Sequence, residues 1–463
     1  MSSLPIFPGS SYSEVRPCSS VSEPRLILSA TELALFSHYL AHTCRTIPFD
    51  TDELYVLQVG VPNLAFQSKP LMASLLALAA ASKAFDLVRD STTALQHMDE
   101  IHPLLIFADQ HYQTSLREVQ GAISCHNHFD HILANSAVMV LYGLASHCVR
   151  IRLAHMAILR NEQLPIDAIP HGTQWIFLIR AAHSAYVGLR RVSSHAQGEV
   201  TVDSTEKATG QSSMNRLDIP SLYGDRVISP EDGPSEMTRR VFFPILAATQ
   251  ASAFKRLRAR FQTVALGEGS HVSSDPLLRT CFLALEILSN IVATVFIDDR
   301  LKTKYSEATN SDVNLSLNGP LSKVSSWLRT YIARVTSVEP SKPLRRTIMA
   351  FLNLVPMDYL SVVQLMLEQS TGDRSQQSSD NRGENCLLLD PKNQLALEIF
   401  AHWLVLVMLL DGVWWIGDLG DWEMRRILLF LDYDTWVSGA KESWWPKTMF
   451  NIRQELFCSP KVR

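Results

Sequence analysis

Four side chains of the types that bind zinc fall close together in this sequence. The segment CHNHFDH contains His126, His128, Asp130 and His131. Imidazole nitrogens and carboxylate oxygens are common ligands of catalytic zinc, which can activate a bound water molecule for hydrolysis. The cluster therefore defines one hypothesis for the function of this protein, a metal-dependent hydrolase.

The spacing of this cluster resembles the H-x-H-x-D-H motif of metallo-β-lactamase-like hydrolases, in which the ligands occupy a loop at the end of a buried strand. Here the preceding run through Leu116, Val119 and Ile123 is amphipathic, and the following ILANSAVMVLYGLA is typical of a helix. Side chains at 126, 128 and 131 on one helical turn cannot all reach one metal ion. His128 and His131, three positions apart, could still hold an adventitious ion.

A structural role accounts for the same residues. Asn127 is predicted to cap a helix, and Asp130 to lie in its first turn near the positive end of the helix dipole. The sequence also lacks a G-x-S-x-G nucleophile elbow, a G-x-x-x-x-G-K-[ST] phosphate loop and an H-E-x-x-H zinc motif. We therefore expect neither enzymatic activity nor a bound metal or cofactor.

The composition is that of an ordinary globular protein. Of 463 residues, 46% are hydrophobic and 19% charged, and the formal net charge is -4, so no nucleic-acid-coating surface is indicated. The seven cysteines stand singly without a C-x-x-C pair, which indicates a reducing compartment. No secretory signal is found, and the longest apolar run, Ile399 to Leu410, is too short for a bilayer. We expect no membrane span and a location in the cytosol or nucleus.

Helical periodicity recurs along the chain, and no alternating strand pattern is found. Ser29 and Glu32 form a predicted capping box, after which apolar residues recur at helical spacing until Pro48. The sequence therefore predicts an all-α fold. The short basic cluster of Arg345 and Arg346 is expected on the solvated face of a helix. Further helices are predicted at about 70–85, 103–123, 129–148, 174–190, 235–264, 276–296, 321–335, 344–368 and 394–410.

Composition along the chain predicts one large domain with interruptions. Residues 1–25, rich in Ser and Pro, predict a disordered tail, and residues 26–456 predict the helical domain. Polar stretches at about 193–234, 303–320 and 370–385 lack the apolar residues needed to offset ordering entropy. We expect these three stretches to be disordered surface insertions.

The segment from Leu395 to Leu456 is unusually rich in tryptophan and glycine. Aromatic side chains at this density either fill a core or line an apolar pocket, and the bare pattern favours the core because most buried aromatics are packed. Glycines allow tight turns and a close approach of the backbone to whatever the indoles cover. The residues concerned are Trp403, Gly412, Trp414, Trp415, Gly417, Gly420, Trp422, Trp436, Trp444 and Trp445.

Three parts of the chain resemble one known family. The run WWIGDLGDWE, followed by WWPKTMFNIRQEL, is similar to the C-terminal signature of fungal-specific transcription factor regulatory domains, particularly the group that includes the sterol uptake control proteins. The opening TELALFSHYLAHTCRTI and VPNLAFQSKPLMASLLALAAASKA, and the central TQWIFLIRAAHSAYVGL, are similar to helices of the same domain. The resemblance covers most of residues 26–456.

The resemblance implies an all-helical regulatory domain that acts in the nucleus on a metabolic gene set, either secondary-metabolite or sterol-related. It implies other transcription factors, coregulators or a second copy of the chain as partners. Relatives carry a six-cysteine zinc cluster before this domain, whereas only Cys18 precedes it here, so DNA contact by this chain alone is not expected. A helical interaction module without a transcriptional role stands beside the hydrolase as an alternative.

The resemblance also implies a ligand-binding loop. In the sterol-sensing members of the family, the glycine-rich loop borders a pocket for a hydrophobic small molecule. Carried over by position, this loop consists of Gly412, Trp414, Trp415, Gly417, Gly420 and Trp422.

Overall fold

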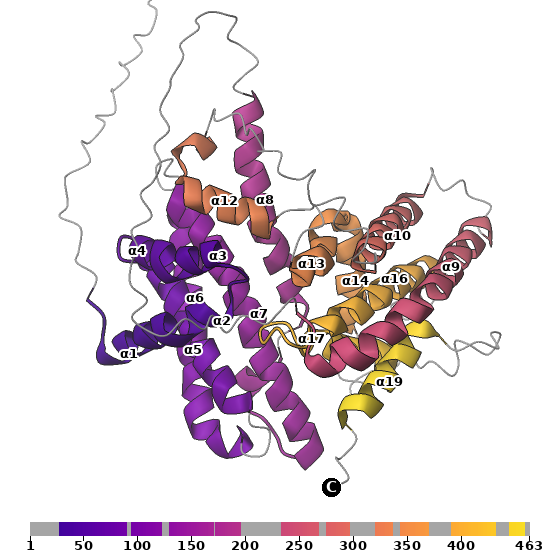
Figure 1. Cartoon of the computed structure of the whole chain (residues 1–463), viewed down its shortest axis with the longest axis horizontal. Helices are drawn as coiled ribbons and strands as arrows, with labels where there is room; N and C mark the ends of the chain where they lie inside the picture. The colour runs from indigo at the N-terminus through magenta and orange to yellow at the C-terminus, as the bar shows by residue number, and fades with distance from the viewer. Residues whose placement is uncertain are drawn as a thin grey trace, which may run out of the picture.

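The regular elements in the described part of the chain are all helices. The computed structural model describes residues 27–89, 94–122, 129–170, 172–195, 233–267, 275–296, 320–336, 343–369, 390–431 and 444–458. No strand occurs within these residues, which confirms the all-α fold class. The predicted tail at 1–25 and most of the three polar stretches lie outside them. Figure 1 shows the helices in two groups, with the earlier helices in one and most of the later helices in the other.

The first group is built around α5 (Lys69–Arg89), which packs against α6 and α7. Every residue of α5 from Leu71 to Ser82 is buried, because alanines at 77 and 79–81 let the neighbouring helices approach closely. The predicted capping box of Ser29 and Glu32 begins the first helix and is confirmed. The other elements of the group are α1 (Ala30–His38), η1 (Tyr39–Thr43), α2 (Cys44–Thr46), α3 (Thr51–Tyr55), η2 (Val56–Gly60), α4 (Val61–Ala65), η3 (Ala94–His97), α6 (Met98–Ala122), α7 (Phe129–Arg160), η4 (Ile166–Ala168) and α8 (Gln174–His195).

The second group surrounds α16 (Pro391–Val407), which continues into the short helix η8 (Met408–Leu410). Two of the later elements lie on the first group. Helix α12 (Ser326–Val335) packs against α7 (Figure 1), and the short helix η6 (Pro320–Lys323) packs against α8 and α7. The remaining elements are η5 (Thr238–Phe242), α9 (Phe243–Gly267), α10 (Pro276–Val295), α13 (Leu344–Leu354), α14 (Met357–Gln369), α17 (Leu419–Leu431) and α19 (Trp445–Cys458).

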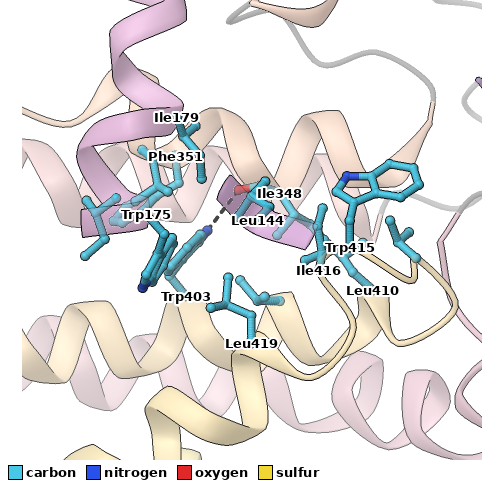
Figure 2. Close-up of a cluster of buried hydrophobic side chains, with 14 of the residues drawn as sticks. Leu144, Trp175, Ile179, Ile348, Phe351, Trp403, Leu410, Trp415, Ile416 and Leu419 are labelled. Carbon is cyan, nitrogen blue, oxygen red and sulfur yellow. Dashed lines mark hydrogen bonds between the residues drawn. The ribbon is translucent and has the colours of Figure 1, made fainter. Parts of the chain in front are cut away.

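Trp403 on α16 lies at the centre of the core. Its side chain is fully buried between Trp175, whose ring centroid is 6.3 Å away, and Phe351, at 5.4 Å. Its indole Nε1 donates a hydrogen bond of 2.8 Å to the carbonyl oxygen of Ile348 (Figure 2). A buried indole needs such an acceptor. For this tryptophan the prediction of a core position is confirmed.

The single helix predicted at 344–368 is wrong, because the structure has two helices there. Helices α13 and α14 meet at an angle of 97°. Between them Val355 is extended, with φ -65° and ψ 151°, and Pro356 follows. A proline disfavours the helical conformation of the residue before it, and this residue therefore ends α13.

Four helices are long and apolar enough, by length and composition alone, to cross a membrane: α5, α7, α10 and Pro391–Leu410. Helices α13 and α14 together would make a fifth. Of the apolar window, 83% is buried inside the protein in α5 and 94% in Pro391–Leu410, but only 50% in α10. Packing within the fold therefore accounts for the apolar character of α5 and α16. The absence of a membrane span stays a prediction.

Two buried titratable groups on α16 contribute with opposite signs to the pH dependence of stability. Burial raises the pKa of Glu398 from 4.5 to about 7, against the opposing effect of Arg260, and lowers the pKa of His402 from 6.5 to about 4. Between about pH 4.5 and 6.5 the folded state therefore holds an extra proton on Glu398, and the unfolded state holds one on His402. The two contributions have opposite signs, so we expect them to cancel.

Variants separate these contributions. Glu398→Gln removes the contribution of Glu398, so the slope of the free energy of unfolding against pH should become more positive than in the native protein, by up to about 1.4 kcal/mol per pH unit. His402→Phe removes the contribution of His402, so the slope should become more negative than in the native protein by a similar amount. Urea unfolding of the native protein and both variants at about pH 5 and pH 6.5 measures the three slopes. Slopes that change in the same direction in the two variants would contradict the assignment.

Candidate ligand-binding site

The glycine-rich loop between η8 and α17 is folded tightly against protein backbone. Gly412 N donates a hydrogen bond of 2.8 Å to Gly233 O, and a Cβ atom on Gly412 would lie 2.6 Å from that oxygen. A Cβ on Gly417 would lie 3.0 Å from Asp411 O, and one on Gly420 2.9 Å from Met408 N. The predicted close approach is present at all three glycines, and in each case the loop approaches the protein's own backbone.

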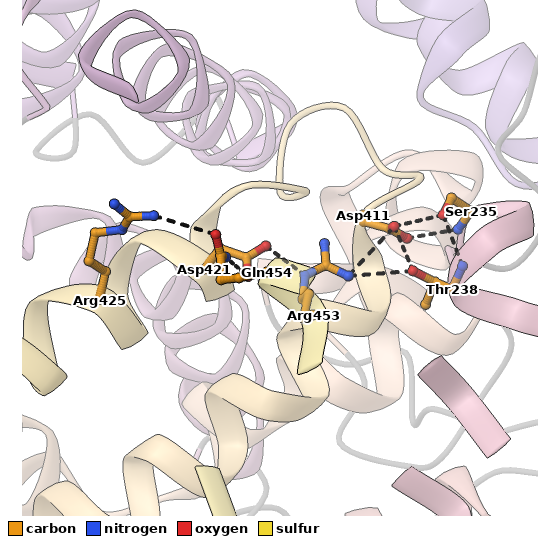
Figure 3. Close-up of polar contacts among 7 residues, drawn as sticks. All are labelled: Ser235, Thr238, Asp411, Asp421, Arg425, Arg453 and Gln454. Atoms are coloured by element: carbon orange, nitrogen blue, oxygen red, sulfur yellow. Dashed lines mark hydrogen bonds and ion pairs between the residues drawn. The ribbon is translucent and has the colours of Figure 1, made fainter. Parts of the chain in front are cut away.

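A buried polar network anchors this loop (Figure 3). The Asp411 carboxylate accepts hydrogen bonds from Ser235 N (2.8 Å), Ser235 Oγ (2.7 Å) and Thr238 Oγ1 (2.6 Å). The Arg453 guanidinium lies 3.7 Å from the same carboxylate and donates to Asp421 Oδ2 at 2.7 Å. Arg453 on α19 thus joins the start of the loop to the first turn of α17.

The three tryptophans assigned to the loop have different surroundings. Trp414 is half-buried, donates from Nε1 to Thr46 Oγ1 at 3.1 Å and packs on Phe85. Trp422 is half-buried beside the ring of His155. Trp415 is 4% exposed and lines a cavity that is partly open to solvent. Of the six residues assigned to a ligand, only Trp415 is among those lining this cavity in the described part of the chain.

The cavity has a volume of about 150 Å³ and lies between the two groups of helices. Its apolar wall includes side chains from four helices and from the loop, of which Figure 2 shows several around the aromatic cluster. The main apolar contributors are Leu144 of α7, Ile179 of α8, Ile332 of α12, Met349 of α13, and Trp415 and Ile416 of the loop. Ligand pockets occur preferentially at such junctions between structural units.

The cavity also has a charged wall. Arg345 and Arg346 line it with Glu53, and the three side chains are 9%, 8% and 4% exposed. Arg345 Nη2 donates to Ile47 O at 2.8 Å and lies 3.8 Å from Glu53, whose carboxylate also forms an ion pair with Arg346. Burial lowers the pKa of the Arg346 guanidinium. The prediction of a solvated face for the two arginines is therefore wrong.

A neutral polar group completes the lining. The side-chain oxygen Oδ1 of Asn353 on α13 is buried and has no hydrogen-bond partner. A buried acceptor without a partner is costly, so such atoms are rare in folded proteins. Sequence reasoning did not find Asn353, Glu53 or the role of the arginines, because burial of these residues depends on contacts between distant helices.

A wider hollow of about 660 Å³ lies on the surface between α9 and α10. Exposed polar side chains, including Lys255, Arg258 and Gln262, line it. Polar groups already in water give a small molecule little additional binding energy. The cavity beside Trp415 has a more apolar lining and is therefore the better candidate site.

The acidic member of the histidine cluster has a structural role. Asp130 lies in the first turn of α7, where it accepts a hydrogen bond of 2.9 Å from Ser325 N and a second one from Ser325 Oγ. Ser325 is the N-cap of α12, so Asp130 supplies this helix with an acceptor from another element. Asn127, His126 and His128 lie outside the described residues. Within the described residues, no group of three or more His, Cys, Asp or Glu could hold a metal ion.

This role of Asp130 leads to a stability prediction. Replacing Asp130 by alanine removes both acceptors at the start of α12, and we expect a loss of about 1–2 kcal/mol in the free energy of unfolding. Asp130→Asn keeps one acceptor and should lose about half as much. Urea unfolding of both variants measures the loss. Equal stability of the alanine variant and the native protein would show that Asp130 does not support α12.

The candidate site thus combines an apolar cavity with two buried guanidinium groups, and Trp415 supplies one wall of the cavity.

In comparisons with known proteins, no family model, no curated protein and no solved structure matches the chain.

Proposed function

We propose that this chain is a nuclear transcriptional regulator whose helical domain binds a small molecule in the cavity beside Trp415. The cavity between the two helix groups is the observation that supports ligand sensing. The transcriptional part rests on the resemblance of three sequence segments to fungal regulatory domains. The regulated genes form a metabolic set, secondary-metabolite or sterol-related, and other transcription factors, coregulators or a second copy of the chain provide the contact with DNA.

The position of the cavity suggests how a ligand acts. Its wall includes Leu144 and Ile179 from the first helix group and Met349 from the second. A molecule that fills the cavity contacts both groups at once and favours the arrangement in which the contacts are made. Trp415 and Ile416 connect this arrangement to the glycine-rich loop, which the Asp411 carboxylate holds against residues 235–238. A change in the cavity is therefore transmitted through the loop to residues 235–238, where we place the contact with a partner protein.

Transcript profiling tests the proposal. Deleting the gene should change the transcripts of a defined metabolic set, and the native chain should restore them. A chain carrying Ala182→Met, which adds volume inside the cavity, should restore them without a response to metabolite levels. Ala182→Ser, which leaves the cavity open, is the matched control and should behave as the native chain. A deletion that leaves every transcript unchanged would overturn the proposal.

A further inference from the structure

A surface groove runs between α9 and α10, which lie at the outer edge of the second helix group (Figure 1). It contains the open hollow of about 660 Å³. Phe254 and Val292, which are 7% and 4% exposed, form its floor. Its lining extends along α9 from Gln250 to Gln262, a rise of about 18 Å or a little over three helical turns. The groove therefore has an apolar floor and the length of a short helix.

Three alanines keep this groove open. Ala251 and Ala259 of α9 and Ala293 of α10 line it, and all three are exposed. A methyl side chain at these positions leaves the space between the two helices empty, whereas a longer side chain would fill it. The two helices can therefore accept side chains from outside the chain.

Apolar surface continues past the hollow on α10. Phe282 and Leu283 are each 44% exposed, and helical spacing puts them on the face that carries Glu286 and Asn290. Asn290 lines the hollow, and Glu286 forms an ion pair with Arg258 of α9 at its edge. Exposed large apolar side chains beside a concave surface are typical of sites where proteins bind one another.

The charge of the groove is positive. Helix α9 contains four basic residues and no acidic residue, in a chain whose formal net charge is -4. Two of the four have carboxylate partners, because Arg258 lies 3.3 Å from Glu286 and Arg260 lies 3.7 Å from Glu398. Lys255 lines the hollow, is exposed, and forms no ion pair or hydrogen bond with the described residues. A carboxylate supplied by a partner can therefore pair with Lys255.

We infer that the groove between α9 and α10 binds an amphipathic helix of a partner protein, with apolar residues on one face and acidic residues beside them. Apolar side chains at helical spacing lie over Phe254 and Val292, and a flanking carboxylate pairs with Lys255. This surface is separate from residues 235–238. Binding there requires neither the cavity beside Trp415 nor a transcriptional role, so it goes beyond the proposed function.

Three peptides of about 18 residues, or five helical turns, test the inference by fluorescence anisotropy with the full chain. The acidic peptide has leucines on one face and glutamates on its flanks. The basic peptide has lysine in place of each glutamate, and the third peptide has alanine in place of each leucine. We expect the acidic peptide to bind in the micromolar range, the basic peptide about tenfold more weakly, and the alanine peptide not to bind. Equal affinity for the acidic and basic peptides, or no binding of the acidic one, would overturn the inference.

Two tryptophan variants locate the binding site. Ala293→Trp fills the groove and should lower the affinity for the acidic peptide about tenfold or more. Thr263→Trp is the matched control, because Thr263 is an exposed residue of α9 that does not line the hollow. This control should bind as the native chain does. Both positions are exposed, so urea unfolding should show nearly native stability for both variants. Equal peptide affinity of the two variants would show that the peptide binds elsewhere, and the inference would be wrong.

Two charge reversals test the role of Lys255. In Lys255→Glu the affinity for the acidic peptide should fall about threefold and that for the basic peptide rise about threefold, so their ratio should change about tenfold. Structural damage would lower both affinities and leave the ratio unchanged. Lys83→Glu, at an exposed position of α5, changes the net charge equally and should leave the ratio as in the native chain. The same ratio in both variants would remove Lys255 from the site.

Other occupants of the groove give different results. If the chain dimerises in sedimentation velocity and Ala293→Trp dissociates the dimer, a second copy covers the groove and the inference is wrong. If duplex DNA of about 20 base pairs binds to the chain and Lys255→Glu abolishes its binding while the acidic peptide does not bind, Lys255 contacts phosphate and the inference is also wrong.

The proposed function fails or stands independently of these results. If the acidic peptide binds as expected but gene deletion changes no transcript, the proposed function fails while the helix-binding groove stands. If gene deletion changes a metabolic set of transcripts but the acidic peptide does not bind, the groove assignment fails alone.

Discussion

Replacing Arg453 by methionine should lower the free energy of unfolding by about 3–5 kcal/mol, the usual cost of removing one partner from a buried ion pair. The Arg453 side chain is 6% exposed, and it lies between the carboxylates of Asp411 and Asp421 (Figure 3). Methionine fills a similar space without the charge. The two carboxylates would then be left in a buried site without their cation.

The variant should also change its pH dependence. Burial raises the pKa of Asp421, and Arg453 opposes that effect. Without Arg453 the pKa of Asp421 rises further, so the folded variant takes up a proton that the unfolded chain releases. The stability deficit of Arg453→Met should therefore be largest near pH 7 and shrink as the pH falls toward about 5. Urea unfolding across this range measures the deficit.

Arg425→Met is the matched control for this prediction. Arg425 is also on the network but at its edge, where it is half-buried and donates a hydrogen bond of 3.5 Å to Gln454 (Figure 3). Its loss should cost less than about 1 kcal/mol. If Arg453→Met and Arg425→Met cost the same, the network does not anchor the loop as described.

Gly412→Ala should lower the free energy of unfolding by about 3 kcal/mol. The new Cβ atom would lie 2.6 Å from Gly233 O and 3.3 Å from Ser235 N. These atoms belong to the backbone and cannot rotate away, so the segment from Gly233 must shift. The shift would weaken the hydrogen bond from Gly412 N to Gly233 O and the contacts of Asp411 with Ser235.

Gly188→Ala provides a control of opposite sign. Gly188 lies within α8, and a Cβ atom there would meet nothing within 4 Å. Alanine stabilises a helix interior relative to glycine by about 0.5–1 kcal/mol. Thermal and urea unfolding of the two variants should therefore move in opposite directions. A neutral Gly412→Ala would contradict the close packing of the loop.

Local sequence signals predicted the helices well, because caps and periodicity are local. The capping box at Ser29 and the start of α10 after Asp275 follow the predicted pattern. The break at Pro356 was missed because apolar residues recur on both sides of it at similar spacing. Helix α7 extends to Arg160, well past the predicted end near Cys148, because no glycine or proline stops it there.

The site was less predictable, because its chemistry depends on contacts between distant segments. Trp415 was found from the density of aromatic residues, and the structure places it on the cavity wall. Arg345 and Arg346 looked like a solvated pair, since adjacent charges carry no information about burial. Glu53, which pairs with them, lies almost 300 positions earlier, and no sequence pattern connects the two regions.

The hydrogen bond between the Trp414 indole and Thr46 spans 368 positions of the chain. At roughly 5 to 20 residues per second, the ribosome needs about 20 to 70 s to synthesise the intervening residues. Phe85, which packs on the same indole, is synthesised almost as long before Trp414. These apolar surfaces of the nascent chain therefore stay without their native partner for tens of seconds.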